Sequence, residues 1–363
     1  MSATLAETFT GTMPVAERQR FDAARLQAYL RAHVEGFDDA GKPIVVEQFK
    51  GGQSNPTYKL TSQEGRGYVL RRKPPGKLLP SAHAVDREYR VISALRDTGV
   101  PVARTYCLCE DESVIGTAFY VMDCVDGRVL WDPSLPGFTR AQRREIFLEM
   151  NRVISALHQV DHVKAGLADY GKTGSYIERQ VGRWTKQYRA SETETLDAMD
   201  RLITWLPANL PPGDETSIVH GDYRLDNLMF HPTEPRIVAV LDWELSTLGH
   251  PLADFAYHCM SWQIPAGVFR GLGGLDLAKL GIPSQDEHVA RYCRNTGRAA
   301  IDPDHWDFYV AYNLFRGAAI LQGIMGRVKD GTAASKQALD AGRAAKPMAE
   351  LAWQQVEKIL ARK

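Results

Sequence analysis

The sequence lacks the features that mark membrane, secreted and nucleic-acid-binding proteins. No apolar run approaches the roughly 18 residues that span a bilayer. The segment before Phe21 has no apolar core and no basic residue ahead of Arg18, unlike a signal or transit peptide. The 44 basic residues balance 44 acidic ones, without a block of like charges that would attract a nucleic acid or a membrane surface. We therefore expect a cytoplasmic protein that binds neither.

Cysteine is scarce as well, with residues only at positions 107, 109, 124, 259 and 293. An odd and scattered set suits a reducing compartment better than a disulfide framework. Cys107 and Cys109 are too closely spaced for a zinc knuckle and have no second pair, so we expect thiols and no structural metal. The P-loop sequence G-x-x-x-x-G-K-[ST] is also absent, which excludes that class of nucleotide-binding protein as a motif.

The first third of the chain alternates short β-like runs with two helical segments. Apolar spacing predicts a helix within 15–33 and an amphipathic helix over about 82–97. Turn residues such as Pro74-Pro75-Gly76 bound the β-like runs. Five strands are expected, over 44–50, 57–60, 68–73, 104–109 and 117–124. The pattern predicts a small N-terminal lobe, residues 1–125, built on an antiparallel sheet.

After Asp126-Gly127 the pattern becomes mainly helical. Helices are expected over 140–159, 177–189, 196–208, 286–298, 304–327 and 334–362. Two β-like runs, 217–220 and 236–241, are expected to form a two-stranded insert among them. Residues 126–363 are therefore predicted to form a larger helical lobe, which makes the chain an α+β protein of two lobes with separate cores.

The insert carries the densest set of chemically useful groups in the chain. It reads His220-Gly-Asp-Tyr-Arg-Leu-Asp-Asn227, and Asp242 follows 15 residues later. Phosphoryl transfer from ATP needs a carboxylate at the acceptor hydroxyl and oxygen ligands for Mg²⁺. Asp222 can accept the hydroxyl proton, while Asn227 and Asp242 can hold the metal. A turn in which Asp222 and Asn227 bond only to their own backbone is the alternative, but the ordered set with Asp242 favours catalysis.

A kinase also needs a cation on the phosphates, held by a carboxylate from a nearby helix. The third β-like run offers Arg71, Arg72 and Lys73, and the following helix offers Glu88. Strand alternation puts Arg71 and Lys73 on one face and Arg72 on the other. Either Arg71 or Lys73 can therefore be the anchor. Glu88 could instead be an exposed charge paired with Arg72 or Arg87.

These motifs resemble those of the aminoglycoside phosphotransferase and choline kinase family, whose signatures read H-G-D-x-x-x-x-N and I-D-W-E. The resemblance covers about residues 40–330 and implies a protein-kinase-like bilobal fold with ATP and Mg²⁺ as cofactors. It favours Arg71 as the phosphate anchor and places adenine on a hinge at Met122 and Cys124. It also implies that Glu244 assists at the metal and that Asp254 braces the catalytic loop.

Further residues complete the expected site. Gly52 and Ser54, between the first two strands, can let backbone N–H groups approach the phosphates, although an ordinary hairpin turn fits the same sequence. His220 is expected to brace the loop rather than to transfer protons. Arg224 is expected to orient the substrate or to cap the loop.

The acceptor is predicted from resemblance and charge. A branch of the family that is fused to some acyl-CoA dehydrogenases is the closer match, on segments 51–58, 70–76 and 242–254. The chain has no flavin domain and no G-x-G-x-x-G, so we expect no redox activity. Residues 256–363 carry 14 basic and 10 acidic residues, a net of +4 (14 minus 10). That balance suits an anionic hydroxyl substrate, met by Arg316, better than a polycationic aminoglycoside.

The sequence thus predicts an ATP- and Mg²⁺-dependent O-kinase that acts on a small-molecule hydroxyl, such as that of a hydroxyacyl-CoA. A catalytically silent kinase-like module that binds a nucleotide or a partner protein is the alternative from another class, and an aminoglycoside kinase is a third. A protein kinase is less expected, because the A-P-E element is missing and Gly221 replaces the Arg of H-R-D.

Overall fold

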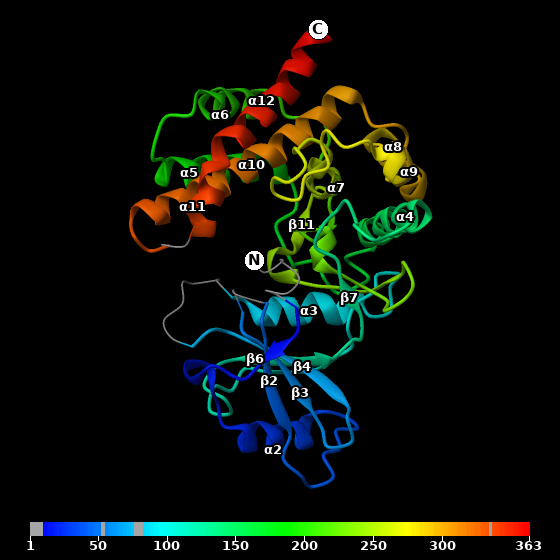
Figure 1. Ribbon diagram of the computed structural model, residues 1–363, viewed down its shortest axis with the longest axis vertical. Coiled ribbons are helices and arrows are strands. Elements are labelled where there is room, and N and C mark those ends of the chain that lie inside the picture. The colour runs from blue at the N-terminus through cyan, green and yellow to red at the C-terminus, as the bar shows by residue number, and fades with distance from the viewer. Residues whose placement is uncertain (1–9, 52–54, 76–82, 334–335) are drawn as a thin grey trace. The chain divides into compact units, whose positions relative to one another are not determined.

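The computed structural model describes residues 10–51, 55–75, 83–333 and 336–363, which belong to two compact units (Figure 1). The first, here called the sheet unit, comprises the chain up to Trp131 together with Val163–Leu167 and Leu225–Ser246. The second, the helical unit, comprises Asp132–His162, Ala168–Arg224 and Thr247–Lys363. The predicted lobe boundary at residue 125 stays a prediction.

A six-stranded antiparallel sheet forms the centre of the sheet unit, in the order β1-β2-β3-β4-β6-β5. The sequence predicted five strands. The sixth strand, β1, was not predicted. Only two of its residues pair with β2, too few to show an alternation of apolar and polar side chains. The strands are β1 (Thr12–Met13), β2 (Val45–Phe49), β3 (Thr57–Thr61), β4 (Gly67–Arg72), β5 (Thr105–Cys109) and β6 (Phe119–Asp123).

Two helices lie on opposite faces of this sheet, α2 (Ala23–His33) and α3 (Val85–Leu95) (Figure 1). The expected helix within 15–33 begins only at Ala23, where the Asp22 side chain accepts hydrogen bonds from two backbone N–H groups. Leu26 and Leu30 of α2 pack on alternate residues of the strands, including Leu60 and Leu70. The intervening residues of β4, Arg71 among them, therefore point to the opposite face, where α3 lies.

A second, three-stranded sheet in the sheet unit carries the end of the predicted motif. β9 (Leu228–Phe230) pairs with β10 (Ile237–Val240) on one side and with β7 (Arg128–Val129) on the other. The expected two-stranded insert is wrong in its pairing. Its first run, β8 (Ser217–Val219), pairs instead with β11 (Thr247–Gly249) in the helical unit. Short β-like runs indicate strands but not their partners, because pairing depends on contacts distant in sequence.

The helical unit is built around α10 (Pro303–Lys329), a helix buried along most of its length. The helices that pack against it are α5 (Tyr176–Ala190), α6 (Asp197–Ala208), α7 (Pro251–Cys259), α11 (Lys336–Arg343) and α12 (Ala345–Ala361). A second group consists of α4 (Arg140–His158) with α8 (Leu277–Leu280) and α9 (Gln285–Thr296) packed against it. Capping boxes start α4 at Thr139 and α9 at Ser284, which fixes where these two helices begin. Among the described residues, no helix combines the length and the apolar character that crossing a membrane would require.

One helical expectation is corrected here, and one helix of the candidate site was not predicted. The single helix expected over 334–362 is two, α11 and α12, with Ala344 between them. The helix α7 was missed, although it supplies two side chains to the candidate site. Every residue of α7 is buried, so its sequence shows no polar stripe and no period that would separate it from a strand.

Candidate active site

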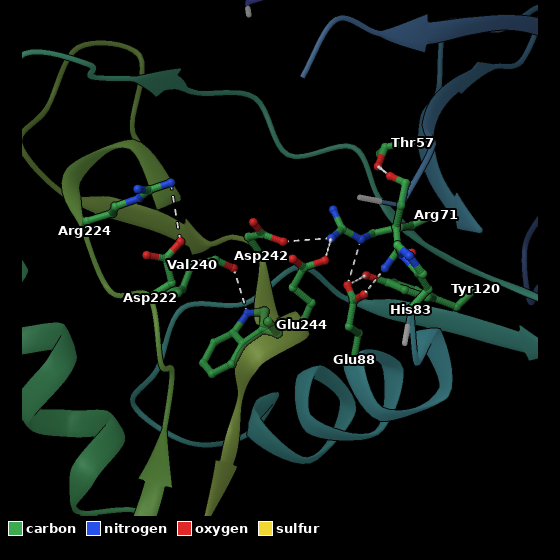
Figure 2. A network of polar contacts seen from close by, with 12 residues as sticks. Thr57, Arg71, His83, Glu88, Tyr120, Asp222, Arg224, Val240, Asp242 and Glu244 are labelled. Carbon is green, nitrogen blue, oxygen red and sulfur yellow. Dashed lines mark hydrogen bonds and ion pairs between the residues drawn. The ribbon is translucent and has the colours of Figure 1, made fainter. Parts of the chain in front are cut away.

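Arg71, at the end of β4, is the centre of an ion-pair network in the sheet unit (Figure 2). Its Nε lies 2.8 Å from Oε2 of Glu88 on α3. Its Nη2 lies 2.7 Å from Oδ1 of Asp242 and 3.5 Å from Oε2 of Glu244. These ion pairs join residues that were predicted at the nucleotide and metal sites. Arg71 and Glu88 lie more than 150 positions before Asp242 and Glu244 in the sequence.

Glu88 is only 1% exposed and is held by neutral donors as well. The Asn55 amide donates to Oε1 at 2.7 Å, and the Tyr120 hydroxyl donates to Oε2 at 3.2 Å. Burial raises the pKa of Glu88 to about 7, while the Arg71 charge acts in the opposite direction. Burial would lower the pKa of Arg71, but its anionic neighbours outweigh burial and raise it. Arg71 is thus a permanent cation shared among three carboxyl groups.

The two other basic residues of this run have different surroundings. Arg72 points to the opposite face, as strand alternation predicts, and donates to the Tyr58 hydroxyl at 3.1 Å and to the Ile115 carbonyl at 3.2 Å. Lys73 follows the end of β4 and lies 3.9 Å from Asp86. Neither contacts Glu88 in any described interaction. The geometry favours Arg71 over Lys73 as the cation held by the helix carboxylate.

Asn227 and Asp242 flank the β9–β10 hairpin, Asn227 just before β9 and Asp242 two residues after β10. The backbone N–H of Leu241 donates to the carbonyl of Asn227 at 2.8 Å, so the two segments run side by side. The indole of Trp243 donates to the Val240 carbonyl at 2.9 Å and fixes the turn in which Asp242 adopts a left-handed conformation, with φ of 62°. The chain thus fixes one carboxylate and one amide on neighbouring segments.

The His220–Arg224 part of the motif lies in the helical unit and is held by Asp254 of α7. The Asp254 carboxylate accepts the backbone N–H of His220 at Oδ2 and that of Gly221 at Oδ1, both at 2.8 Å. His158 Nε2 lies 3.2 Å from Oδ2 and connects through Nδ1 to the Tyr292 hydroxyl. Burial would raise the pKa of Asp254, but its bonds with His158 and the loop backbone outweigh burial and lower it. His220 Nδ1 in turn accepts the N–H of Asp222 at 3.2 Å.

Within the helical unit, Tyr257 and Arg224 contact Asp222, and Arg316 contacts the residue before it. The Tyr257 hydroxyl donates to Oδ1 of Asp222, and Arg224 Nη2 lies 3.4 Å from Oδ2 (Figure 2). Arg316 of α10 donates through Nη2 to the Gly221 carbonyl at 2.7 Å. Its guanidinium lies over the rings of Tyr257 and Trp184, 4.8 and 5.4 Å from their centroids. Arg316 is therefore buried against the loop backbone and close enough to Asp222 for their charges to interact.

The remaining predicted residues are less informative. Met122 lies in β6, paired with Val69. Cys124 comes directly after β6, and its N–H donates to the Gly67 carbonyl at 3.4 Å. Gly52 and Ser54 lie outside the described residues. Asn55, Tyr120 and Tyr257 were missed as site residues, because a single neutral side chain in a strand, turn or helix carries no pattern.

The chain is similar to known proteins along nearly its whole length. It is 48% identical over 344 residues to "Acyl-CoA dehydrogenase family member 10" of Mus musculus. The matched region covers 94% of this chain and 32% of that protein. The chain spans less than half the length of the first curated relatives that it matches. A crystal structure described as a candidate aminoglycoside phosphotransferase from Ralstonia eutropha is 59% identical, with a TM-score of 0.86 over 93% of this chain and 99% of that one.

More distant structures share the fold. The choline kinase of Cryptosporidium parvum superposes with a TM-score of 0.61 at 12% identity, over 94% of this chain and 97% of that one. An aminoglycoside phosphotransferase in complex with AMP-PNP and hygromycin B superposes with a TM-score of 0.58 at 14% identity, over 92% and 99%. The predicted protein-kinase-like fold, with a small antiparallel sheet and a mainly helical remainder, is confirmed. The model of the phosphotransferase enzyme family matches residues 45–303, and the chain belongs to that family.

Proposed function

We propose that this protein is an ATP- and Mg²⁺-dependent kinase that phosphorylates a hydroxyl group of a small molecule. The observation that carries the proposal is the Arg71 network, which joins the Glu88 carboxylate to Asp242 through one buried guanidinium. Kinases use a strand cation paired with a helix carboxylate to hold the phosphates, and an aspartate after a strand to hold the metal. Membership of a phosphotransferase family supports the same chemistry.

In this proposal Arg71 anchors the phosphates, oriented by Glu88. The hinge residues Met122 and Cys124 lie at the adenine. Asp222 accepts the proton of the acceptor hydroxyl and orients it for in-line attack on the γ-phosphorus. The Asp254 carboxylate holds the loop through the backbone amides before Asp222.

Asn227 and Asp242 would hold the magnesium ion, which neutralises phosphate charge when bound. Their donors are amide and carboxylate oxygens, the type that Mg²⁺ prefers, and the Leu241–Asn227 backbone bond keeps the two segments together. Glu244 is a further carboxylate beside Asp242. The described residues contain no group of three or more His, Cys, Asp or Glu able to hold a metal. That fits an ion bound by few protein ligands and completed by phosphates and water.

For the acceptor we propose an anionic or acyl-type hydroxy compound, such as a hydroxyacyl-CoA. The names of the similar curated proteins refer to acyl-CoA dehydrogenases, and the net positive charge of residues 256–363 disfavours a polycation. Arg316, a basic residue of this segment, lies against the loop, and its Nη2 binds the Gly221 carbonyl.

The Asp222→Asn variant tests the catalytic role. We expect it to bind ATP–Mg²⁺ about as tightly as the wild type in calorimetry, yet to lose several orders of magnitude in turnover, because the amide cannot accept a proton. Asp286→Asn, on the exposed start of α9, is the matched control and keeps full turnover. Turnover retained by Asp222→Asn would remove that residue from its role.

A mass-spectrometric screen would identify the acceptor. Purified protein with ATP and Mg²⁺ is incubated with hydroxyacyl-CoAs, other hydroxylated metabolites and kanamycin, and products are scored for a gain of about 80 daltons, the mass of one phosphoryl group. Kanamycin phosphorylated faster than every hydroxyacyl-CoA would overturn the proposed acceptor class. Nucleotide binding without transfer to any acceptor or to water would favour the silent module.

A further inference from the structure

Tyr257 occupies a position that neither the motifs nor the family signatures assign. It lies on α7, three residues after Asp254, so the two side chains leave the same face of the helix. Asp254 accepts the backbone N–H groups of His220 and Gly221. The Tyr257 hydroxyl donates to Oδ1 of the next residue, Asp222. Within one turn of α7, Asp254 therefore holds the loop backbone and Tyr257 holds the Asp222 side chain.

The surroundings keep Tyr257 protonated and packed in place. Its side chain is buried, and burial together with the Asp222 charge raises the pKa of the phenol, which therefore stays protonated at physiological pH. Arg316 lies over the ring, 4.8 Å from its centroid, and is itself fixed by the bond to the Gly221 carbonyl. The charged groups close to the phenol are Asp222, Arg224 and Arg316. The ring cannot turn away without breaking the contact with Arg316.

We infer that Tyr257 is a positioning residue for phosphoryl transfer, which fixes the orientation of the Asp222 carboxylate through Oδ1. The inference rests on the proposed role of Asp222 as the group that receives the acceptor proton. An aspartate side chain turns about two bonds, and one directed hydrogen bond to a single oxygen selects one arrangement. Proton acceptance requires such an arrangement, because misorientation of the reacting group slows an enclosed reaction steeply.

The test compares Tyr257→Phe, which keeps the ring under Arg316 and removes only the hydroxyl, with Tyr309→Phe. The control loses a buried tyrosine hydroxyl on α10 that lies 3.1 Å from His250 Nε2, so both variants lose one internal hydrogen bond. Two readouts are taken at neutral pH. The first is steady-state turnover of ATP–Mg²⁺ with water as the acceptor. The second is the ¹³Cγ resonance of Asp222, assigned by its disappearance in Asp222→Asn.

For Tyr257→Phe we expect kcat to fall about 10- to 100-fold, the loss in rate that corresponds to removing one hydrogen bond to a charged group. KM for ATP should stay within about twofold of the wild type. The Asp222 resonance moves in this variant and stays in place in Tyr309→Phe. An unchanged kcat in Tyr257→Phe, or equal losses in the two variants, would refute the positioning role.

The readouts separate this inference from the proposed function. A wild-type protein that transfers no phosphoryl group to any acceptor refutes the proposed function by itself. In that case the resonance decides: a shift confined to Tyr257→Phe keeps Tyr257 as the residue that orients Asp222, and no shift overturns it.

Discussion

Replacing Glu88 with glutamine tests whether the buried carboxylate beside Arg71 is held at an energetic cost. The side chain keeps its shape, but its single amide oxygen can accept from only one of the two donors, because Asn55 donates to Oε1 of Glu88 at 2.7 Å and Tyr120 to Oε2 at 3.2 Å. The lost bond lowers stability at every pH, whereas the lost charge changes how stability depends on pH. In the wild type the pKa of Glu88 is raised from 4.5 to about 7, because the side chain is buried and lies near Asp242 and Glu244.

The sign and size of the effect follow from linkage. A carboxyl group whose pKa is higher in the folded protein binds its proton more tightly there, so its stabilisation is complete below about pH 4.5 and is lost as the pH rises to about 7. Each pKa unit corresponds to about 1.4 kcal/mol, which gives about 3 kcal/mol across this window. Glu88→Gln lacks a titrating group, so its free energy of unfolding relative to the wild type rises by about that amount between the two pH values.

Urea unfolding of both proteins at half-unit steps from pH 4.5 to 8 measures the difference. Glu110→Gln, an exposed residue just after β5, is the control and should parallel the wild type throughout. Equal pH dependence in wild type and Glu88→Gln would refute the reasoning. It would mean that Arg71 fully compensates the carboxylate despite being shared with Asp242 and Glu244.

Three other changes test the helical unit. Burial lowers the pKa of His258 to about 4, so the wild type should lose up to about 3 kcal/mol as the pH falls from 6.5 to 4, and His258→Gln should show a shallower decline in thermal unfolding over this range. Ser284→Ala removes the side-chain cap of α9 and should cost about 1 kcal/mol in urea unfolding; no loss would mean that water replaces the cap. Gly281→Ala should cost more, since φ is 81° and a Cβ would lie 2.5 Å from the Arg140 carbonyl oxygen; a neutral result would show that this turn relaxes.

The sequence predicted the parts of the site that follow a periodic or ordered pattern. The amphipathic α3 and the alternation along β4 brought Arg71 and Glu88 to the same side of the sheet, as the structure has them. Strand alternation also separated Arg72 from Arg71 correctly. These features depend on neighbours within one strand or helix, where side-chain direction repeats with a fixed period.

The features that failed depend on contacts distant in sequence. Pairing of β8 with β11 joins residues about 30 positions apart, and nothing local in Ser217–Val219 encodes that partner. The fully buried α7 has no polar face to reveal a helical period. Tyr257 could not be recognised either, because its proposed role depends on its contact with Asp222, 35 positions earlier in the sequence.

The bonds from Asp254 to the loop are made to backbone amides and not to side chains. An amide offers the same donor whatever residue carries it, so these two bonds do not depend on side-chain identity, although the His220 ring also accepts the N–H of Asp222 and Gly221 has a positive φ. Other residues of the helical unit can therefore change without removing the two bonds that hold the chain before Asp222. Under the proposed function, this backbone anchor would let residues that recognise the acceptor vary while the position of Asp222 is kept.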